Sequence, residues 1–398
     1  MLDFLFVGIG QCGNKFVDAF AYQKNKALAI NTTQKDMYCL ENINKQNLIE
    51  ISAAGTKGGA GKTPALGEKA MKEHLDEVLQ KIYDVGQESD YVFLWAGLGG
   101  GTGSGGLPVL LKRLIEDKKK KILVGLTLPD DSEGVEVQVN AFNSALKTLR
   151  IIDGNRIPYI LIENNKIKNK MNMVNDFDWR SVNATISKIF SQFNKSANKN
   201  SPYSTFDETD FKKTLYMSGM MSLVKVVVGA KDITTENTLK DTIIEAWKKN
   251  NFFVDFDYTT ARIITTVIEA PSKYLENKSN YKLLDTSLLK LRDACGAISP
   301  YTGVYPYDEK KENRNDKITV YCMLTGLKAP VEKLQQLQAK AKEEQEAMKE
   351  KSSHNAIDLS SFDALDDPFG EKDSDDDLAG LDGLDAFGEK KDDPLGYL

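Results

Sequence analysis

Two patterns of hydrophobic and polar positions alternate along the chain. Short apolar runs rich in β-branched and aromatic residues, typical of buried strands, occur in the first half at residues 3–9, 26–31, 48–51, 91–95, 121–126 and 159–162. Between them, apolar residues recur every three or four positions, as in residues 64–84 and 107–117, and predict helices. This alternation predicts an α/β fold with a parallel, Rossmann-like sheet covered by helices on both faces.

The predicted sheet also indicates where a ligand binds. Ligands of such sheets lie beyond the carboxyl ends of the strands, where loops lead into helices. We therefore expect the functional residues in the loops that follow Ile9, Asn31, Ile51, Trp95, Leu126 and Ile162.

The second half of the chain follows a different plan. Apolar residues at helical spacing in residues 179–193 predict a long central helix. A second, smaller α+β domain is predicted from strand-like runs and helices at residues 223–228, 238–248, 261–269, 283–292 and 318–324. After Pro330, a mostly charged helix is expected, docked by its first turns, with the apolar stripe Val331, Leu334, Leu337 and Ala341.

Length and charge refine this division. The 398 residues suit two packed domains. We expect a first domain at 1–176, the central helix at 177–195, a second domain at 196–328 with a functional loop at 201–211, a C-terminal helix at 329–351 and a tail at 352–398. Residues 355–398 hold 14 acidic and 3 basic residues, a net charge of −11, so residues 1–354 carry +5 of the total of −6. A mildly basic body without a dense basic stripe argues against direct DNA binding.

The tail is predicted to be disordered when free, because so few apolar residues and so much like charge cannot form a core. It contains an imperfect repeat of short apolar segments, DDPFG at residues 366–370, DAFG at 385–388 and DDPLG at 392–396. Two interpretations stay open: a solubilising tail, or a peptide that folds onto a partner.

Composition excludes several kinds of chemistry. Cys12, Cys39, Cys295 and Cys322 lack the spacing of a zinc site or a disulfide scaffold, so we expect reduced thiols and no metal held by the protein's own side chains. The two histidines, His74 and His354, are expected to be solvated and give little support to triad chemistry. No apolar run is long enough to span a bilayer, and we expect a soluble, cytoplasmic protein that does not bind membranes.

Three glycine-rich segments follow predicted strands. Residues 97–106, GLGGGTGSGG, separate a buried strand from a helix expected to begin near Leu107, and can turn several N–H groups toward a phosphate. Residues 8–14, GIGQCGN, form a second such turn. Residues 57–63, KGGAGKT, match the variant P-loop of ParA-like partition ATPases, an alternative disfavoured because this segment comes third and two richer glycine loops accompany it.

The first two segments together resemble one family. GGGTGSG at residues 99–105 resembles the tubulin/FtsZ signature, and GIGQCGN resembles that family's first nucleotide loop. The resemblance implies that GTP or GDP binds here with Mg²⁺, with Gly59–Gly61 beside the γ-phosphate and residues 99–104 around the α- and β-phosphates. The implied contacts on the phosphate side are Gly10, Gln11, Cys12, Asn14, Asn31, Thr32, Gly59, Ala60, Gly61, Gly99, Gly100, Gly101, Thr102, Gly103 and Ser104.

The same resemblance assigns the sugar and the base. Glu133 would reach the ribose, and Asn164 matches the asparagine that reads guanine. Asp178, or its neighbour Trp179, would complete the base pocket at the start of the central helix. The basic residue that the family carries one turn after the ribose glutamate is missing, since Val137 or Gln138 stands there.

The resemblance further implies a catalytic loop with two carboxylates three residues apart. Asp207 and Asp210 have this spacing, and in the family such groups polarise the water that attacks the γ-phosphate of the neighbouring subunit. Asp255 and Asp257 form a rival pair that runs into a predicted strand. An active site split between two copies implies a head-to-tail homopolymer, because such a contact does not close on itself.

Within the family, the C-terminal helix and polar tail resemble TubZ, the branch that moves plasmid and phage DNA. That resemblance implies a DNA-bound adaptor, TubR in that branch, which would attach through the acidic C-terminal region. Two alternatives stay open: an FtsZ-like cell-division filament, and a glycine-rich scaffold without activity.

Overall fold

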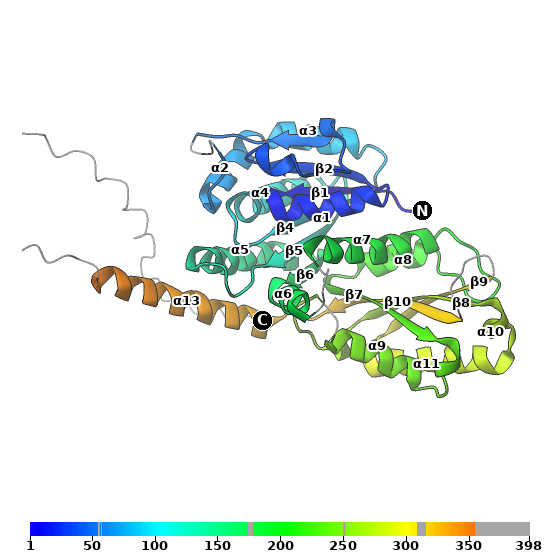
Figure 1. Cartoon of the computed structure of the whole chain (residues 1–398). Coiled ribbons are helices and arrows are strands. Elements are labelled where there is room, and N and C mark those ends of the chain that lie inside the picture. Colours follow the sequence, from blue (N-terminus) through cyan, green and yellow to red (C-terminus); the bar gives the residue numbers. More distant parts are fainter. Residues whose placement is uncertain (55, 57, 174–177, 250–251, 309–315, 355–398) are drawn as a thin grey trace, which may run out of the picture. The chain divides into compact units, whose positions relative to one another are not determined.

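The computed structural model describes residues 1–54, 56, 58–173, 178–249, 252–308 and 316–354, of which residues 1–348 belong to one compact unit. The predicted tail from residue 355 onward lies outside the described residues. Ten strands form one sheet in the order β3-β2-β1-β4-β5-β6-β7-β10-β8-β9 (Figure 1). The strands are β1 (Phe4–Ile9), β2 (Lys26–Asn31), β3 (Leu48–Glu50), β4 (Tyr91–Gly97), β5 (Lys121–Leu128), β6 (Pro158–Glu163), β7 (Gly219–Gly229), β8 (Ile263–Pro271), β9 (Ser299–Tyr307) and β10 (Lys317–Leu327).

The helices fall between these strands as the alternating pattern predicts. Those before the central helix are α1 (Gly10–Tyr22), α2 (Pro64–Glu73), α3 (Leu75–Val85), α4 (Gly101–Asp117), α5 (Val135–Gly154) and α6 (Asn164–Met173). The central helix is α7 (Trp179–Ser196), and the later helices are α8 (Glu208–Tyr216), α9 (Thr238–Lys249), α10 (Ser272–Glu276), α11 (Lys278–Cys295) and α13 (Val331–His354). The first six strands of the sheet, in the order β3-β2-β1-β4-β5-β6, are all parallel to one another. This arrangement confirms the predicted α/β fold.

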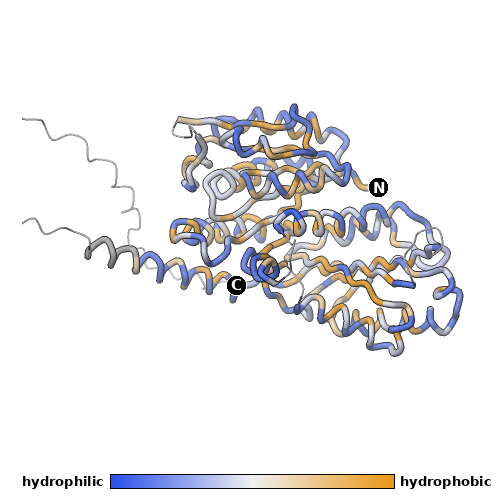
Figure 2. Tube along the Cα trace, viewed as in Figure 1, coloured by the Kyte–Doolittle hydropathy of each residue, from blue (hydrophilic) through white to orange (hydrophobic). Residues whose placement is uncertain are grey.

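Alternation along β1 divides the interior into two hydrophobic cores, one on each face of the sheet. Leu5, Val7 and Ile9 pack with α2, α3, α4 and α5, whereas Phe4 and Phe6 pack with α1 and α7. The second core is largely aromatic, and the rings of Phe6 and Phe20 stack with their centroids 3.9 Å apart. The apolar strands between polar helix surfaces are visible in Figure 2.

The strands of the C-terminal half continue the same sheet. β7 pairs in parallel with β6 at only two positions, and then runs antiparallel to β10. β9, which the sequence pattern did not predict, pairs in parallel with β8 at the edge of the sheet. Its prolines, Pro300 and Pro306, argue against a central strand, but an edge strand tolerates residues without a backbone N–H.

Helix α4 begins at Gly101, six residues before the predicted start near Leu107. Much of the predicted glycine loop is therefore the first turns of the helix. Glycine is required there because α2 crosses α4 at close range: a Cβ atom on Gly105 would lie 1.9 Å from the carbonyl oxygen of Pro64, and one on Gly67 would lie 2.3 Å from that of Gly101. The glycine run serves helix packing as well as the loop.

The helix predicted at residues 64–84 is divided at His74 into α2 and α3. The His74 side chain explains the break, because it lies between the two helices and the segment after β3. Its Nδ1 is 2.9 Å from a carboxylate oxygen of Glu77, and its Nε2 is 2.8 Å from the carbonyl oxygen of Ser52. His74 is partly exposed, as expected, but two polar contacts also hold its side chain, whereas the side chain of His354 is not described.

Gly105→Ala tests the packing of α2 against α4. The added methyl group would force the two helices apart, and we expect the free energy of unfolding to fall by about 3 kcal/mol. Gly154→Ala is a matched control, because nothing lies within 4 Å of the added methyl group and alanine favours a helix. Chemical denaturation followed by circular dichroism measures both variants. Equal stabilities would contradict the role assigned to Gly105.

Candidate nucleotide-binding site

A cavity of about 360 Å³ lies at the carboxyl ends of the parallel strands, where the sequence predicts the ligand. Fifteen of the predicted binding residues line it: Gly10, Gln11, Cys12, Asn31, Thr32, Gly59, Ala60, Gly61, Gly99, Gly100, Gly101, Thr102, Gly103, Glu133 and Asn164. Residues from loops as far apart as Gly10 and Asn164 thus share one cavity. The segment of the KGGAGKT motif from Gly58 to Lys62 belongs to the same wall and forms no separate phosphate site there.

Two helices begin on the wall of this cavity. Gly10, Gln11 and Cys12 open α1, and Gly101, Thr102 and Gly103 open α4. The first N–H groups of a helix have no acceptor within it, and they lie at its positive end. Gly10 has a φ of +74°, and a Cβ atom on it would lie 3.0 Å from the Gly103 nitrogen, so glycine lets the two helix starts approach each other. The arrangement fits the phosphate groups of a nucleotide.

Hydroxyl and amide groups join the loops around the cavity. Thr32 Oγ1 and Thr102 Oγ1 are 2.7 Å apart, and the Ala60 N–H donates to Thr32 Oγ1 at 3.1 Å. Asn140, on α5, donates to the carbonyl oxygens of Lys62 and Gly99, at 2.6 and 3.2 Å. The segments that contain Thr32, residues 60–62 and residues 99–102 are therefore held together by hydrogen bonds within the protein itself.

Three predicted contacts, Asn14, Ser104 and Asp178, do not line the cavity and instead form hydrogen bonds within the protein. The Asn14 side chain binds both backbone polar groups of Ile30, which joins α1 to β2. Ser104 Oγ accepts a hydrogen bond of 2.8 Å from the Gly99 N–H. Asp178 caps α7, where its carboxylate accepts from the Ser181 N–H at 2.8 Å, and these hydrogen bonds lower the pKa of Asp178.

Several residues of the cavity wall were not predicted from the sequence. They are Ile9, Thr33, Asp36, Gly58, Lys62, Gly97, Leu98, Thr127, Pro129 and Val137. Asp36 could have been found, because it lies in the loop expected after Asn31. Its carboxylate accepts a hydrogen bond of 3.2 Å from Asn31. Val137, one of the two candidates for the place of the missing basic residue, makes this part of the wall apolar.

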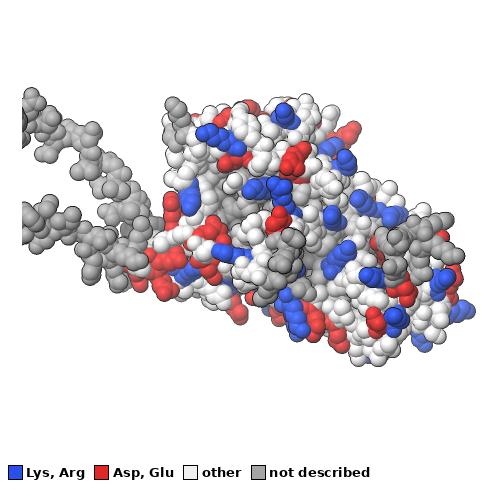
Figure 3. All heavy atoms as spheres, in the orientation of Figure 1, with Lys and Arg blue, Asp and Glu red and all other residues white. Residues whose placement is uncertain are grey.

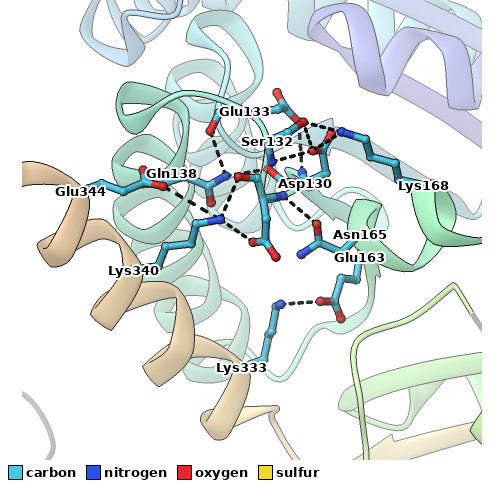
Figure 4. A network of polar contacts seen from close by, with 11 residues as sticks. Asp130, Ser132, Glu133, Gln138, Glu163, Asn165, Lys168, Lys333, Lys340 and Glu344 are labelled. Atoms are coloured by element: carbon cyan, nitrogen blue, oxygen red, sulfur yellow. Dashed lines mark hydrogen bonds and ion pairs between the residues drawn. The ribbon is translucent and has the colours of Figure 1, made fainter. Parts of the chain in front are cut away.

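One side of the cavity is formed by the loop that contains Pro129 and Glu133, and part of this loop is drawn in Figure 4. Pro129 and Glu133 line the cavity. Glu133 also fixes its own loop, because its carboxylate accepts a hydrogen bond of 3.1 Å from the Asp130 N–H. Gln138 Nε2 donates to the Asp130 carbonyl oxygen at 2.7 Å, so the Gln138 side chain anchors this loop to α5.

The acidic loop lies at the opposite end of the strands. Glu208, between Asp207 and Asp210, is 3.1 Å from the amino group of Met1, just before β1. β1 has six residues and is about 17 Å long, and the cavity begins at its far end. Asp207 caps α8 through the Asp210 N–H at 2.9 Å, and burial together with the Asp207 charge raises the pKa of Asp210. Neither carboxylate can reach the cavity of its own chain.

The rival carboxylates have other roles. Asp255 is paired with Lys166 at 2.7 Å, and Asp257 accepts a hydrogen bond of 2.9 Å from the Thr259 N–H at a short turn. Among the described residues, no cluster of three or more His, Cys, Asp or Glu side chains could hold a metal ion. The part of the chain that is described also contains no helix long and apolar enough to cross a membrane.

A parallel α/β sheet with two helix starts and glycine loops around one cavity defines a nucleotide-binding protein. Residues 3–172 match the tubulin/FtsZ family, GTPase domain. The tubulin-like protein CetZ of Pyrococcus horikoshii is 31% identical over 329 residues, which cover 81% of this chain and 85% of that protein. The chain belongs to the tubulin/FtsZ family, as its glycine motifs predict.

The likeness to TubZ is less specific. TubZ of Bacillus cereus is 28% identical over 258 residues, which cover 60% of this chain and 58% of that protein. A structure of TubZ-Bt in a two-stranded filament shares the fold with a TM-score of 0.75 and 20% identity, covering 93% of this chain and 95% of that one. The sequence identity with CetZ is higher and extends further along the chain, so the assignment to the TubZ branch is not confirmed.

Alkylation of the cysteines tests access to the cavity. Burial raises the pKa of the Cys12 thiol, and the thiolate is the reactive form, so iodoacetamide should modify Cys12 more slowly than the exposed Cys39 at neutral pH. The difference should narrow in alkaline solution, where more of Cys12 ionises. Added GDP should protect Cys12 and leave Cys39 unchanged, as measured by mass spectrometry of the peptides. Equal modification of both thiols at neutral pH, with or without GDP, would contradict this site.

Proposed function

We propose that the chain binds GTP in this cavity and hydrolyses it after assembling head to tail into a filament. One observation carries the proposal: the cavity and the acidic loop lie at opposite ends of β1 in the same molecule. Each half of the site is incomplete alone. Stacking one subunit on the next brings the Asp207 loop of one copy to the cavity of the other, and the contact repeats without closing.

Each part of the site has a chemical task in this proposal. The N–H groups that open α1 and α4 would bind the phosphates, and the hydroxyls of Thr32 and Thr102 would add donors. Asn164 would read guanine and Glu133 the ribose. Mg²⁺ would neutralise charge that develops on the phosphates, with its ligands coming mostly from the nucleotide and water.

The acidic loop would act on the attacking water. Asp207 and Asp210 would orient that water, and the raised pKa of Asp210 favours its taking up a proton. The carboxylates lie next to the capped start of α8, which fixes their spacing. Assembly is then required for turnover, because the water-polarising groups arrive only with the next subunit.

Electron microscopy and turnover measurements test assembly. Filaments should form with GTP and be absent or short-lived with GDP. Turnover per subunit should rise steeply with protein concentration. A rate per subunit that is independent of concentration would mean that the active site is complete in the monomer.

Asp207→Asn and Asp210→Asn test the catalytic loop. Asparagine keeps the cap on α8, so both variants should bind GTP and polymerise, whereas turnover should fall at least about 100-fold. Asp257→Asn is the control, because it changes a carboxylate of the rival pair that also caps a turn. Sedimentation separates polymer formation from phosphate release. Unchanged turnover in either loop variant would overturn the assignment of that residue.

For the biological role, we propose movement of plasmid or phage DNA through a DNA-bound adaptor of the TubR kind. The long helix α13 and the acidic tail support this proposal, together with the TubZ likeness in sequence and fold. On the face in Figure 3, Lys and Arg side chains are interspersed with Asp and Glu, so an adaptor suits DNA attachment better than the body itself. The greater identity with CetZ keeps a filament without DNA cargo as the alternative.

Deleting residues 355–398 tests the tail. Polymerisation and GTP turnover should be retained, because the site and both ends of β1 lie within residues 1–348. Pull-down of a basic adaptor bound to DNA should be lost, since the tail carries a net charge of −11. Retained pull-down would make the tail a passive solubiliser, and lost polymerisation would assign it to the filament contact.

A further inference from the structure

Helix α13 is attached to the wall of the nucleotide cavity. Lys340 Nζ donates to Asp131 twice, to the backbone carbonyl oxygen at 3.0 Å and to the carboxylate at 2.6 Å. About two turns earlier on the helix, Lys333 forms an ion pair with Glu163, the last residue of β6 (Figure 4). The two lysines therefore bind residues that are 32 positions apart in the sequence, Asp131 and Glu163.

Both segments continue directly into residues of the cavity. Asp131 lies in the loop whose Pro129 and Glu133 line the cavity, and Glu163 precedes Asn164, which lines it too. The Asp131 N–H donates to Asn165 Oδ1 at 2.7 Å, so the two segments are also joined to each other. A continuous set of polar contacts thus runs from α13 to the sugar and base side of the cavity.

The loop is held from a second direction by α6. Lys168 is paired with Asp130 at 3.0 Å and also donates to Ser132. In Figure 4, Lys168 and Lys340 approach the loop from different helices. Asp130 is therefore held by α6, whereas Asp131 is held both by Asn165 of α6 and by Lys340 of α13.

The strength of the attachment is set by burial. The side chains of Lys333 and Glu163 are 18% and 9% exposed, so their charges are poorly screened by solvent. Asp131 is more exposed, and although burial acts to raise its pKa, the hydrogen bonds from Lys340 and Asn165 outweigh this and lower the pKa. Leu337 and Ala341 of α13 are also buried, so the helix docks through apolar side chains as well.

We propose that Lys340 and Lys333 are positioning residues for the nucleotide, through which docking of α13 and binding of guanine nucleotide stabilise each other. The inference rests on the proposed function of the cavity. Coupling between two sites is reciprocal, so whatever loosens α13 must weaken nucleotide binding, and bound nucleotide must hold α13 more firmly. Because the acidic tail follows α13 in the chain, a partner attached there can act on nucleotide exchange.

The experiment uses the full chain with fluorescent N-methylanthraniloyl-GDP, which avoids polymerisation. Lys340→Ala should release this nucleotide about fivefold faster than the native chain, as expected for the loss of one ion pair. Lys340→Arg should restore slow release, because it keeps the charge. Lys342→Ala is the matched control. Lys342 is exposed on the same helix and forms no ion pair with any residue that the structure describes.

A second measurement reads the coupling from the other side. GDP should slow hydrogen–deuterium exchange of the α13 amides around residues 333–344 in the native chain, and should do so much less in Lys340→Ala. This readout compares each protein with and without nucleotide, so it holds even where the substitution lowers overall stability. Equal nucleotide release by Lys340→Ala and Lys342→Ala, or α13 exchange that ignores GDP in the native chain, would overturn the inference. Failure of the native chain to bind GDP would instead overturn the proposed function.

Discussion

The structure depends on the close approach of two helix starts at one edge of the sheet. α1 and α4 both begin in glycine. A Cβ atom on Gly103 would lie 2.6 Å from the carbonyl oxygen of Gly97 in β4, and one on Gly10 would lie 3.0 Å from the Gly103 nitrogen. Two positive helix ends directed at one place repel each other unless an anion or other acceptor lies between them. The cavity is therefore electrostatically incomplete on its own, and its preference for a phosphorylated ligand follows from the backbone as much as from any side chain.

In the proposed function, the same geometry determines where catalysis can occur. α7 has 18 residues and is about 27 Å long, and it runs beside α1 from the cavity end toward the amino end of β1. Asn194, near the end of α7, binds both backbone polar groups of Leu2, so the helix fixes the acidic loop at a constant distance from the cavity. In the proposed function, this rigid spacer keeps Asp207 and Asp210 away from the phosphates of the nucleotide bound by the same subunit. GTP hydrolysis then requires contact with the next subunit in the filament.

The sequence revealed the loops of the cavity better than it revealed the role of each residue in them. Strand ends and glycine runs located Gly10, Thr32, Gly99 and Asn164 at one edge, because the topology of a parallel sheet leaves few other arrangements. Motif position does not say which way a side chain points, so Asn14 and Ser104 were assigned to the ligand although they bind Ile30 and Gly99. The contacts of Lys333 and Lys340 join segments more than 160 residues apart, and no local pattern encodes them.

His74, outside the cavity, holds the segment after β3 in a way that depends on pH. Both ring nitrogens face oxygen acceptors, Glu77 and the Ser52 carbonyl, so only the imidazolium form can donate to both. The contact with Glu77, together with the charge of nearby Glu73, raises the pKa of His74 above its ordinary value, although partial burial opposes this. The stabilisation is complete below that ordinary value and is lost as the pH rises through the raised one. Ser52 follows β3, so the hydrogen bond that holds this residue to the start of α3 weakens as the pH rises through the raised pKa.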